Sequence, residues 1–328
     1  MPQSYHHLTH DDRCQIYALK STDTKQSDIA KLIGVHPSTI SRELKRNQGG
    51  NGYRYLQAQR LADQRRHQAS TTKHVMTPTR IEQVESLLRQ RWSPEQIAGR
   101  LKRGGILVSY ESIYQHVRED KARGGHLYTY LRHRGKKYSK RSSKHAGRGC
   151  IPNRVDIDKR PQVVERKSRF GDWEGDTVIG AKQKGVLVTY VERKSKYTLI
   201  HAVKNKTAEV VTQATISGFS AIPRMVKTIT YDNGKEFAQH RHIANQLETT
   251  CYFAKPYHSW ERGLNEHTNG LIRQYLPKGQ ALDEVTQQDI ITIQEALNNR
   301  PRKVLGYLTP REVFFKVLNQ EEKIALHG

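Results

Sequence analysis

The sequence has little cysteine, and its three cysteines are scattered. Cys14, Cys150 and Cys251 lie far apart and form no CxxC pair, which argues against a disulfide framework and against a cysteine-based zinc site. No run of about 18 apolar residues occurs, and the first residues lack the apolar stretch of a signal peptide. We therefore expect a cytoplasmic protein in a reducing compartment that neither spans a membrane nor is exported.

Acidic residues are also scarce relative to basic ones. The 328 residues include 56 Lys and Arg against 32 Asp and Glu, which gives a formal net charge of +24. Residues 1–150 carry +17 of this excess. Such an imbalance is typical of chains that bind a polyanion, most simply nucleic acid. A basic protein with solvated charged faces is the alternative.

Residues 8–46 show the pattern of a helix-turn-helix. Apolar spacing predicts a helix over 26–33, Gly34 supplies a turn, and a short basic helix begins at Pro37. In this motif the second helix enters the major groove of DNA with its N-terminal residues first. An ordinary helical hairpin is the alternative, and in both cases Ile40 and Leu44 pack inward. The predicted DNA contacts are the polar and basic residues Ser38, Thr39, Ser41, Arg42, Lys45 and Arg46.

A second unit of this kind is predicted further along the chain. Ser93 and Gln96 have the spacing of a capping box around Pro94. Residues 109–117 then form a second candidate recognition helix, whose predicted DNA contacts are Ser109, Tyr110 and Ser112. Residues 132–148 contain eight Lys or Arg and no acid, which predicts an exposed linker that orders on a phosphate backbone.

From Phe170 the pattern is that of a mixed α/β domain. Three β-prone runs predict an antiparallel meander, and helices then alternate with two short strands before two final helices. This order matches a ribonuclease H-like core. We therefore predict a multidomain chain, with an all-α helix-turn-helix region followed by an α/β ribonuclease H-like catalytic core. The predicted ranges are 1–70 and 71–131 for the two helical DNA-binding regions, 132–165 for the basic linker and 166–328 for the core.

Acidic residues in three local contexts indicate a site for a hard divalent cation, which prefers oxygen ligands. Asp232 closes a predicted strand before an Asn-Gly turn. Glu266 lies in a predicted helix that carries Asn269 and Arg273 on the same polar face, where they could touch DNA phosphates.

The third acid is ambiguous from spacing alone. Asp172, Glu174 and Asp176 alternate along one predicted strand, so all three point to the same side. Asp176 adjoins the apolar end of the strand, which favours it modestly, and the other two could be edge groups.

Several motifs in this region together resemble a known family. They are Trp-Glu-Gly-Asp at 173–176, Tyr-Asp-Asn-Gly at 231–234, Arg-Gly-Leu-Asn-Glu-His-Thr-Asn-Gly at 262–270, Arg-Gln-Tyr-Leu-Pro-Lys-Gly at 273–279 and the segment 297–310. This ordered set, with 33 residues between the second and third acids, resembles the DDE transposases of the bacterial insertion-sequence "thirty" family. Their catalytic core is shared with retroviral integrases. The segment 258–261 and Leu264 depart from the family pattern, which bears on packing and DNA contacts.

The resemblance implies a function and the residues that perform it. It assigns Asp176, Asp232 and Glu266 as the catalytic, metal-binding triad. Two Mg²⁺ ions, with Mn²⁺ as a substitute, would lie between these carboxylates. The DNA contacts of this region would be made by Asn269, Arg273 and Lys278.

The implied activity is that of a transposase, which binds the terminal inverted repeats of its element and catalyses DNA cleavage and strand transfer. Its partners would be double-stranded DNA, both element ends and target, and a second copy of the chain or more, because two ends must be joined. It would lie in the bacterial cytoplasm with the nucleoid. The alternatives are a ribonuclease H-like nuclease that only hydrolyses and a DNA-binding repressor with an inactive catalytic domain. Two sequence readers argue against the first, and three intact acids argue against the second.

Overall fold

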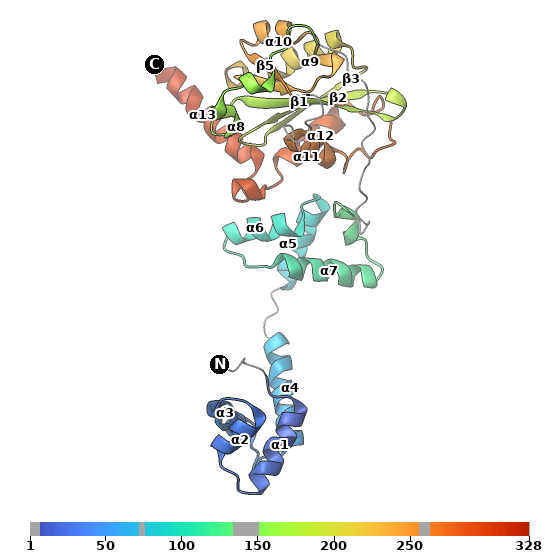
Figure 1. Ribbon diagram of the computed structural model, residues 1–328. Coiled ribbons are helices and arrows are strands. Elements are labelled where there is room, and N and C mark those ends of the chain that lie inside the picture. Colours follow the sequence, from blue (N-terminus) through green and yellow to red (C-terminus); the bar gives the residue numbers. More distant parts are fainter. Residues whose placement is uncertain (1–6, 72–75, 134–150, 256–262, 328) are drawn as a thin grey trace. The chain divides into compact units, whose positions relative to one another are not determined.

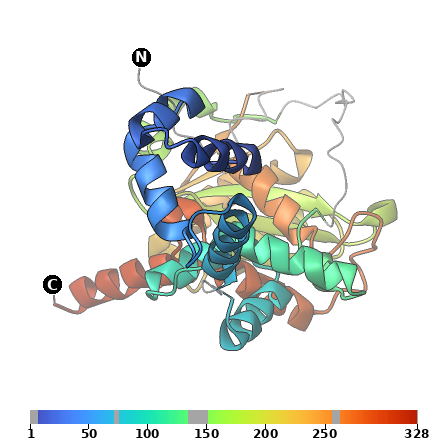
Figure 2. The same ribbon diagram turned by 90° about the horizontal axis from the view of Figure 1, so that it is seen from below.

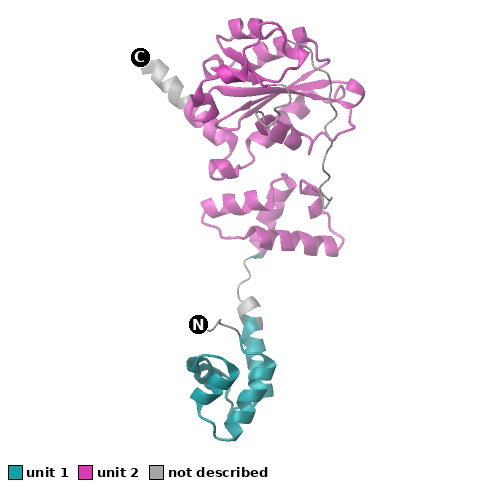
Figure 3. Ribbon diagram, viewed as in Figure 1, with its two compact units in different colours: residues 1–77 teal, residues 78–328 magenta. Residues whose placement is uncertain are grey.

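The chain divides into two compact units. The computed structural model describes residues 7–71, 76–133, 151–255 and 263–327 (Figure 1). Unit 1 spans residues 1–77 and unit 2 spans residues 78–328 (Figure 3). The domain boundaries predicted at 131 and 165 both lie inside unit 2. Within the described residues, no helix is long and apolar enough to cross a membrane.

The described part of unit 1 is a cluster of helices (blue in Figures 1 and 2). A capping box between Thr9 and Asp12 starts the first helix, and Gly34, with φ of 78°, ends the second in a left-handed conformation. The predicted helix-turn-helix is confirmed, and Ile40 and Leu44 are buried as expected. The helices are α1 (His10–Ser21), α2 (Gln26–Ile33), α3 (Pro37–Asn47) and α4 (Tyr55–Thr71).

Unit 2 opens with a helical part that the sequence predicted incompletely. The capping box of Ser93 and Gln96 is present at the start of its middle helix, but the helix before it was not predicted. Each of the three helices in this part buries an apolar side chain: Val84, Ile97 and Ile113 are inaccessible to solvent. The elements are α5 (Pro78–Arg89), α6 (Pro94–Arg103), α7 (Tyr110–Ala122) and the short η1 (Leu127–Tyr130).

The rest of unit 2 is built on a five-stranded mixed sheet. The strand order is β3-β2-β1-β4-β5. β1 and β3 are antiparallel to β2, as the predicted meander requires, whereas β4 runs parallel to β1 and β5 runs parallel to β4. The strands are β1 (Asp172–Ile179), β2 (Val186–Glu192), β3 (Thr198–Val203), β4 (Thr228–Tyr231) and β5 (Thr250–Phe253).

Helices cover both faces of this sheet (Figure 1). One face packs on α9 (Ala208–Phe219), α10 (His240–Gln246) and the start of α13 (Pro310–His327), through a core that includes Trp173, Phe219 and Phe314. The other face packs on α11 (Gly263–Ile272) and α12 (Gln287–Asn298), through a core that includes Leu187, Ile272 and Leu297. Short 3-10 turns complete the fold: η3 (Ala181–Gln183), η4 (Pro223–Met225), η5 (Lys235–Phe237) and η7 (Lys303–Leu305).

The described end of the predicted linker is folded onto the sheet. Residues 134–150, which hold most of its basic side chains, lie outside the described residues. After them come η2 (Ile157–Lys159) and α8 (Gln162–Glu165). The backbone N–H of Phe253 in β5 donates to the carbonyl of Val155 at 2.9 Å, and Ile157 and Val164 are buried.

Helix α6 also contacts the C-terminal part of unit 2. A Cβ added at Gly99 would lie 2.3 Å from the ring of Tyr307, so only glycine allows this close approach. Arg100 pairs with Glu312, and Lys303 Nζ lies 2.6 Å from a carboxylate oxygen of Glu95. The helical part of unit 2 is therefore attached to the sheet domain by packing as well as by the chain.

The turn between β2 and β3 contains Lys196, and the surroundings of this side chain destabilise its charged form. Burial, followed by the charge of Lys167, lowers the pKa of Lys196 to about 8 from its usual 10.5. Its ammonium donates to the carbonyl of Arg193. A lysine whose folded-state pKa lies below its unfolded value costs stability below about pH 8, and this cost is lost as the pH rises toward 10.5.

We therefore expect Lys196→Met to unfold at a higher temperature than the parent at pH 7, with the difference shrinking as the pH rises through 8 to 10. Thermal unfolding of both proteins across this pH range measures the effect. Lys182→Met, at an exposed lysine of η3, is the matched control, and its difference should not vary with pH in this way. A pH-independent difference for Lys196→Met would contradict the electrostatic explanation.

Candidate active site

Asp176 and Asp232 lie at matching positions of two neighbouring strands. β1 and β4 run parallel, with Glu174 beside Thr230. The same offset, continued by two residues, places Asp176 beside Asp232, which directly follows β4. Because neighbouring strands lie about 4.8 Å apart, the two carboxylates come from adjacent backbones. The carboxyl ends of parallel strands are where α/β proteins place ligand-binding groups.

Helix α11 reaches the same place through Asn269. The Asn269 amide donates to Asp176 Oδ2 at 2.8 Å, and the Thr189 hydroxyl donates to Asn269 Oδ1 at 3.3 Å. Glu266 lies three residues before Asn269 and therefore on the same helix face. It is exposed in the first turn of α11. The helix face that carries Glu266 thus packs against the strand that carries Asp176.

The other two acids of β1 have structural partners. Asp172 and Glu174 are 0% and 2% exposed, so the expectation that they could be edge groups is wrong. Asp172 accepts from Arg169, and Glu174 is bound by Arg193. Guanidinium groups neutralise these two carboxylates. The Asp176 carboxylate is half-buried and accepts from the Asn269 amide.

The turn after β4 is held from several sides. Asp232 Oδ1 accepts from the backbone N–H of Gly234 at 2.9 Å, so this residue does start the turn that its sequence context suggested. The Asn233 amide donates to the carbonyl of Ala254, and its oxygen accepts from Arg154. These contacts fix the backbone next to the Asp232 carboxylate. Arg154 was not predicted, because nothing in its local sequence relates it to a turn 79 residues away.

A further acid near the site was missed. Glu236 Oε1 accepts from the Thr177 hydroxyl of β1 at 2.9 Å, which holds this carboxylate beside the residue that follows Asp176. Its position four residues after Asp232, in the same turn, was the signal that could have indicated it.

The predicted DNA contacts on α11 have different surroundings. Arg273 donates to the carbonyl of Ile179 at 2.8 Å and so ties the end of α11 to the end of β1. Lys278 is exposed in the loop that follows. Asn269 contacts Asp176, as described above. The departing segment at 258–261 lies outside the described residues.

The three triad residues do not form a closed cluster of ligands. Across the described ranges, no three His, Cys, Asp or Glu side chains converge enough to hold a metal ion. The structure does bring together the elements that carry these residues, which are β1, the turn after β4 and α11.

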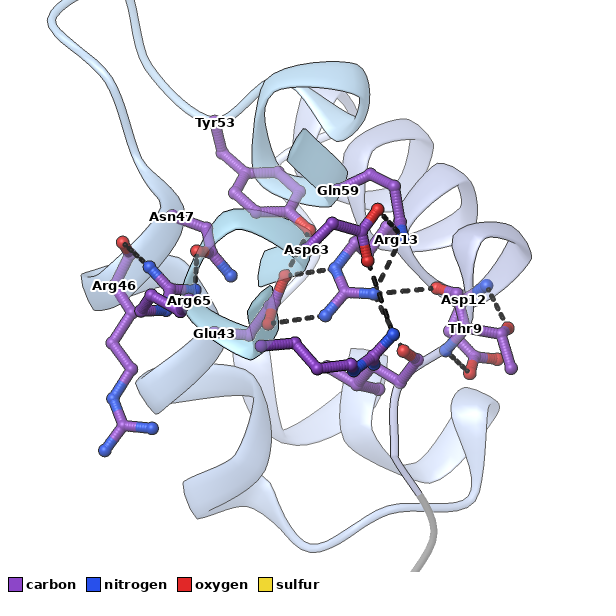
Figure 4. A network of polar contacts seen from close by, with 12 residues as sticks. Thr9, Asp12, Arg13, Glu43, Arg46, Asn47, Tyr53, Gln59, Asp63 and Arg65 are labelled. Carbon is purple, nitrogen blue, oxygen red and sulfur yellow. Dashed lines mark hydrogen bonds and ion pairs between the residues drawn. The ribbon is translucent and has the colours of Figure 1, made fainter. Parts of the chain in front are cut away.

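In unit 1, a polar network fixes the inner face of the recognition helix (Figure 4). Arg13 of α1 pairs with Glu43 of α3 at 2.8 Å, and both side chains are nearly inaccessible to solvent. The hydroxyl of Tyr53 donates to Glu43 at 3.1 Å, and Arg65 of α4 donates to Asn47. With that face occupied, the opposite face of α3 is open to a partner.

The predicted contacts on α3 occupy this open face. Ser41, Arg42, Lys45 and Arg46 are exposed, and Ser38 and Thr39 are half-buried. Arg42 donates to the Ser38 hydroxyl at 2.6 Å. A cleft of about 440 Å³ beside α3 is bordered by Arg42, Arg46, Arg65 and Arg66.

In the second helical part, the predicted contacts are partly used for capping. The Ser109 hydroxyl accepts from the backbone N–H of Ser112 at 3.0 Å and so caps α7. Tyr110 is 54% exposed, and the outer face of α7 carries Gln115 and Arg118 in the open. This helix has the exposed polar face that a reader of DNA needs, but the two serines belong to its cap.

Comparison with known proteins identifies both parts of the chain. The helix-turn-helix domain family matches residues 4–47, and the integrase core domain family matches residues 166–259. The transposase for insertion sequence element IS4351 of Bacteroides fragilis is 49% identical over 317 residues, covering 96% of this chain and 97% of the relative. Transposase InsI for insertion sequence element IS30A of Escherichia coli (strain K12) is 34% identical over 327 residues, covering 94% and 83%. The catalytic core domain of BIV integrase covers 47% of this chain and 99% of its own, with 21% identity and a TM-score of 0.38.

A DNA-binding helix-turn-helix joined to an integrase core defines a class of nucleotidyl-transferase enzymes that act on DNA strands. Within this class, the relatives are similar over nearly the whole chain. The chain belongs to the IS30 family of insertion-sequence transposases.

Proposed function

We propose that this transposase cleaves and joins DNA with a DDE triad of Asp176, Asp232 and Glu266, and that the triad binds Mg²⁺. The proposal is supported by the parallel register of β1 and β4, which puts Asp176 next to Asp232 when it is continued by two residues, and by the hydrogen bond from Asn269 of α11 to Asp176. The donor set is entirely carboxylate, which suits Mg²⁺ and Mn²⁺. The residues therefore fit the metal.

Each residue has a role that follows from its surroundings. Asn269 orients the Asp176 carboxylate, and the Gly234 N–H orients that of Asp232. Glu266, which is exposed on α11, would complete the set of carboxylates from the helix side. When bound, Mg²⁺ supplies Lewis acidity, which makes a water or a DNA 3′-hydroxyl a better nucleophile and neutralises charge on the phosphate.

The positive charge of the chain offsets the repulsion between carboxylates and DNA. The net charge of +24 attracts DNA from solution, and binding falls steeply with salt because counterions are released. We propose at least a homodimer on DNA, since two element ends have to be joined.

The test is an assay with DNA that carries the element ends and with Mg²⁺, Mn²⁺ or EDTA. The proposal expects cleavage and joining with either metal and neither with EDTA. Cleavage without joining would indicate a hydrolytic nuclease, and binding without cleavage would indicate a repressor. Either result would overturn the proposal.

The exposed face of α3 predicts how two substitutions would change DNA binding. Arg42→Gln and Arg46→Gln are each expected to weaken binding to the element end roughly tenfold and, where the lost contact is to a phosphate, to lower the salt slope by about 1. Fluorescence anisotropy over a KCl series measures both quantities. Lys20→Gln, at an exposed lysine at the end of α1, removes the same charge away from α3 and should change binding little. Equal losses in all three variants would contradict the assignment of α3 as the reader.

A further inference from the structure

Two of the most buried arginines have no carboxylate partner among the residues that the structure describes. Arg300 and Arg302 are 2% and 8% exposed. Arg300 donates to the side-chain oxygens of Gln96 and Gln274, at 2.8 and 2.7 Å, and Arg302 donates to the carbonyl of Leu297 at 3.1 Å. All of these acceptors are neutral.

The other buried arginines of the described chain behave differently. Arg13 pairs with Glu43, Arg160 with Glu165 and Arg193 with Glu174. A buried charge is normally paired, because desolvation without a counter-charge is costly. The uncompensated state of Arg300 and Arg302 is therefore an exception within this chain, and it needs a cause.

The energetic cost of burying these two charges is visible in lowered pKa values and in polar atoms without a hydrogen-bond partner. Burial, together with smaller contributions from neighbouring positive charges, lowers the pKa of Arg302 to about 9 and that of Arg300 to about 10. The buried Nη1 of Arg302 and the Tyr275 hydroxyl have no hydrogen-bond partner within the described chain. A nearby negative charge would relieve both arginines.

Two further arginines extend the cluster toward solvent. Arg91 donates to the carbonyl of Gln274 and lies over the ring of Tyr275, 4.7 Å from its centre. Arg132 is exposed, and its charge is close enough to lower the pKa of both Arg300 and Arg302. The cluster thus has a buried base and one exposed guanidinium group.

The position of Arg132 relates the cluster to the active site. A Cβ added at Gly270 of α11 would lie 2.7 Å from Arg132 Nη2, so the guanidinium group occupies the space that a side chain at 270 would fill. Gly270 follows Glu266 by one helical turn, about 6 Å along the axis. The exposed guanidinium therefore lies beside the helix face that carries Glu266.

We propose that the arginine cluster of Arg91, Arg132, Arg300 and Arg302 binds a phosphate of the DNA backbone that lies next to the phosphate at which the DNA is cleaved. Arg132 contacts the phosphate directly, while Arg300 and Arg302 supply positive potential from the protein side. A phosphodiester suits this cluster because it keeps its charge at neutral pH and offers two oxygens to the planar guanidinium group. Being sequence-independent, the contact positions the strand and does not read it.

This inference rests on the proposed function, since Glu266 defines the place of cleavage, but its test does not require catalysis. Binding of a fluorescent mixed-sequence DNA duplex is measured in EDTA over a KCl series. Arg132→Gln is expected to weaken binding about three- to tenfold and to lower the slope of log K against log salt by about 1. Arg302→Gln is expected to weaken binding as well, and the effect of Arg132→Gln should become smaller in the Arg302→Gln background.

Arg100→Gln is the matched control. Arg100 joins the same helical part to the same C-terminal segment, but it pairs with Glu312, so its loss should leave the salt slope unchanged. A parental slope in Arg132→Gln, or an equal loss in Arg100→Gln, would overturn the proposal. If Arg302→Gln does not fold, the exposed Arg132 decides the question alone. Absence of cleavage in the Mg²⁺ assay would overturn the catalytic proposal and leave this result standing, and the reverse also holds.

Discussion

Asp232→Asn is expected to lower DNA cleavage and joining by at least about a thousandfold, because catalytic groups that act as a unit fail together. The substitution keeps the shape of the side chain and its hydrogen bond from Gly234 while removing the negative charge that a metal ligand needs. The expected loss is the same for Asp176→Asn and for Glu266→Gln. The measurement is the cleavage and joining assay with Mg²⁺, alongside DNA binding in EDTA, which should be preserved.

Glu209→Gln is the control for this series. Glu209 is exposed in the first turn of α9, on a helix that packs on the sheet face opposite α11. It removes one carboxylate from the same domain and should leave activity unchanged. Strand transfer at the parental rate by Asp232→Asn would show that the catalytic assignment is wrong.

Glu174→Gln is expected to destabilise the sheet domain by about 3 kcal/mol, because removing one partner of a buried ion pair leaves an uncompensated charge. Glu174 and Arg193 are 2% exposed each. Arg193 also lies 3.6 Å from Glu165, which is largely exposed and neutralises it only in part. The unfolding free energy from urea titration at pH 7 measures the loss.

A double variant separates the ion pair from the fold. Glu174→Leu combined with Arg193→Met replaces both charges with apolar groups and should be less destabilised than either single variant. Residual catalysis is also informative, since Glu174→Gln should keep cleavage activity at a temperature where it remains folded. Loss of activity in the folded Glu174→Gln protein would show that Glu174, and not only Asp176, takes part in the chemistry.

These two predictions distinguish the roles of Asp176 and Glu174, which the sequence pattern alone could not distinguish. Alternation along β1 gave Asp172, Glu174 and Asp176 equal standing, because a period of two places all three on one side. The difference lies in Arg169 and Arg193, which neutralise the first two. Arg193 is 19 residues from Glu174, so no local pattern reveals the pairing. Family resemblance had selected Asp176, and the ion pairs supply a physical reason for that choice.

The elements themselves were predictable where their signals were local. Apolar periodicity indicated α2, a proline at the first helical position indicated α3, and β-prone runs with short polar connections indicated β1 to β3. Helix α5 was missed although its first residue, Pro78, follows a threonine and is the kind of start signal that marked α6. The parallel pairing of β4 with β1 could not be derived either, since it joins residues more than 50 positions apart, yet continuing this register by two residues is the basis for setting Asp232 next to Asp176.

The contact between α6 and the C-terminal segment also lay beyond sequence reasoning. No local pattern relates Gly99 to Tyr307, which lies more than 200 residues further along the chain and whose ring fills the space of a Cβ at position 99. The Arg-Pro-Arg of 300–302 was part of the family pattern, but its lack of acidic partners is a property of the folded chain.

The packing of Gly99 against Tyr307 limits how freely the helical part of unit 2 can move against the sheet domain. A reader attached to a catalytic domain only by a flexible tether would sample many separations, and the position of cleavage would vary with tether length. Here the helical part of unit 2 and the sheet domain are joined by a direct interface. On the proposed assignment of α7 to DNA contact and of Asp176 and Asp232 to cleavage, that interface would fix the distance along the DNA between the two.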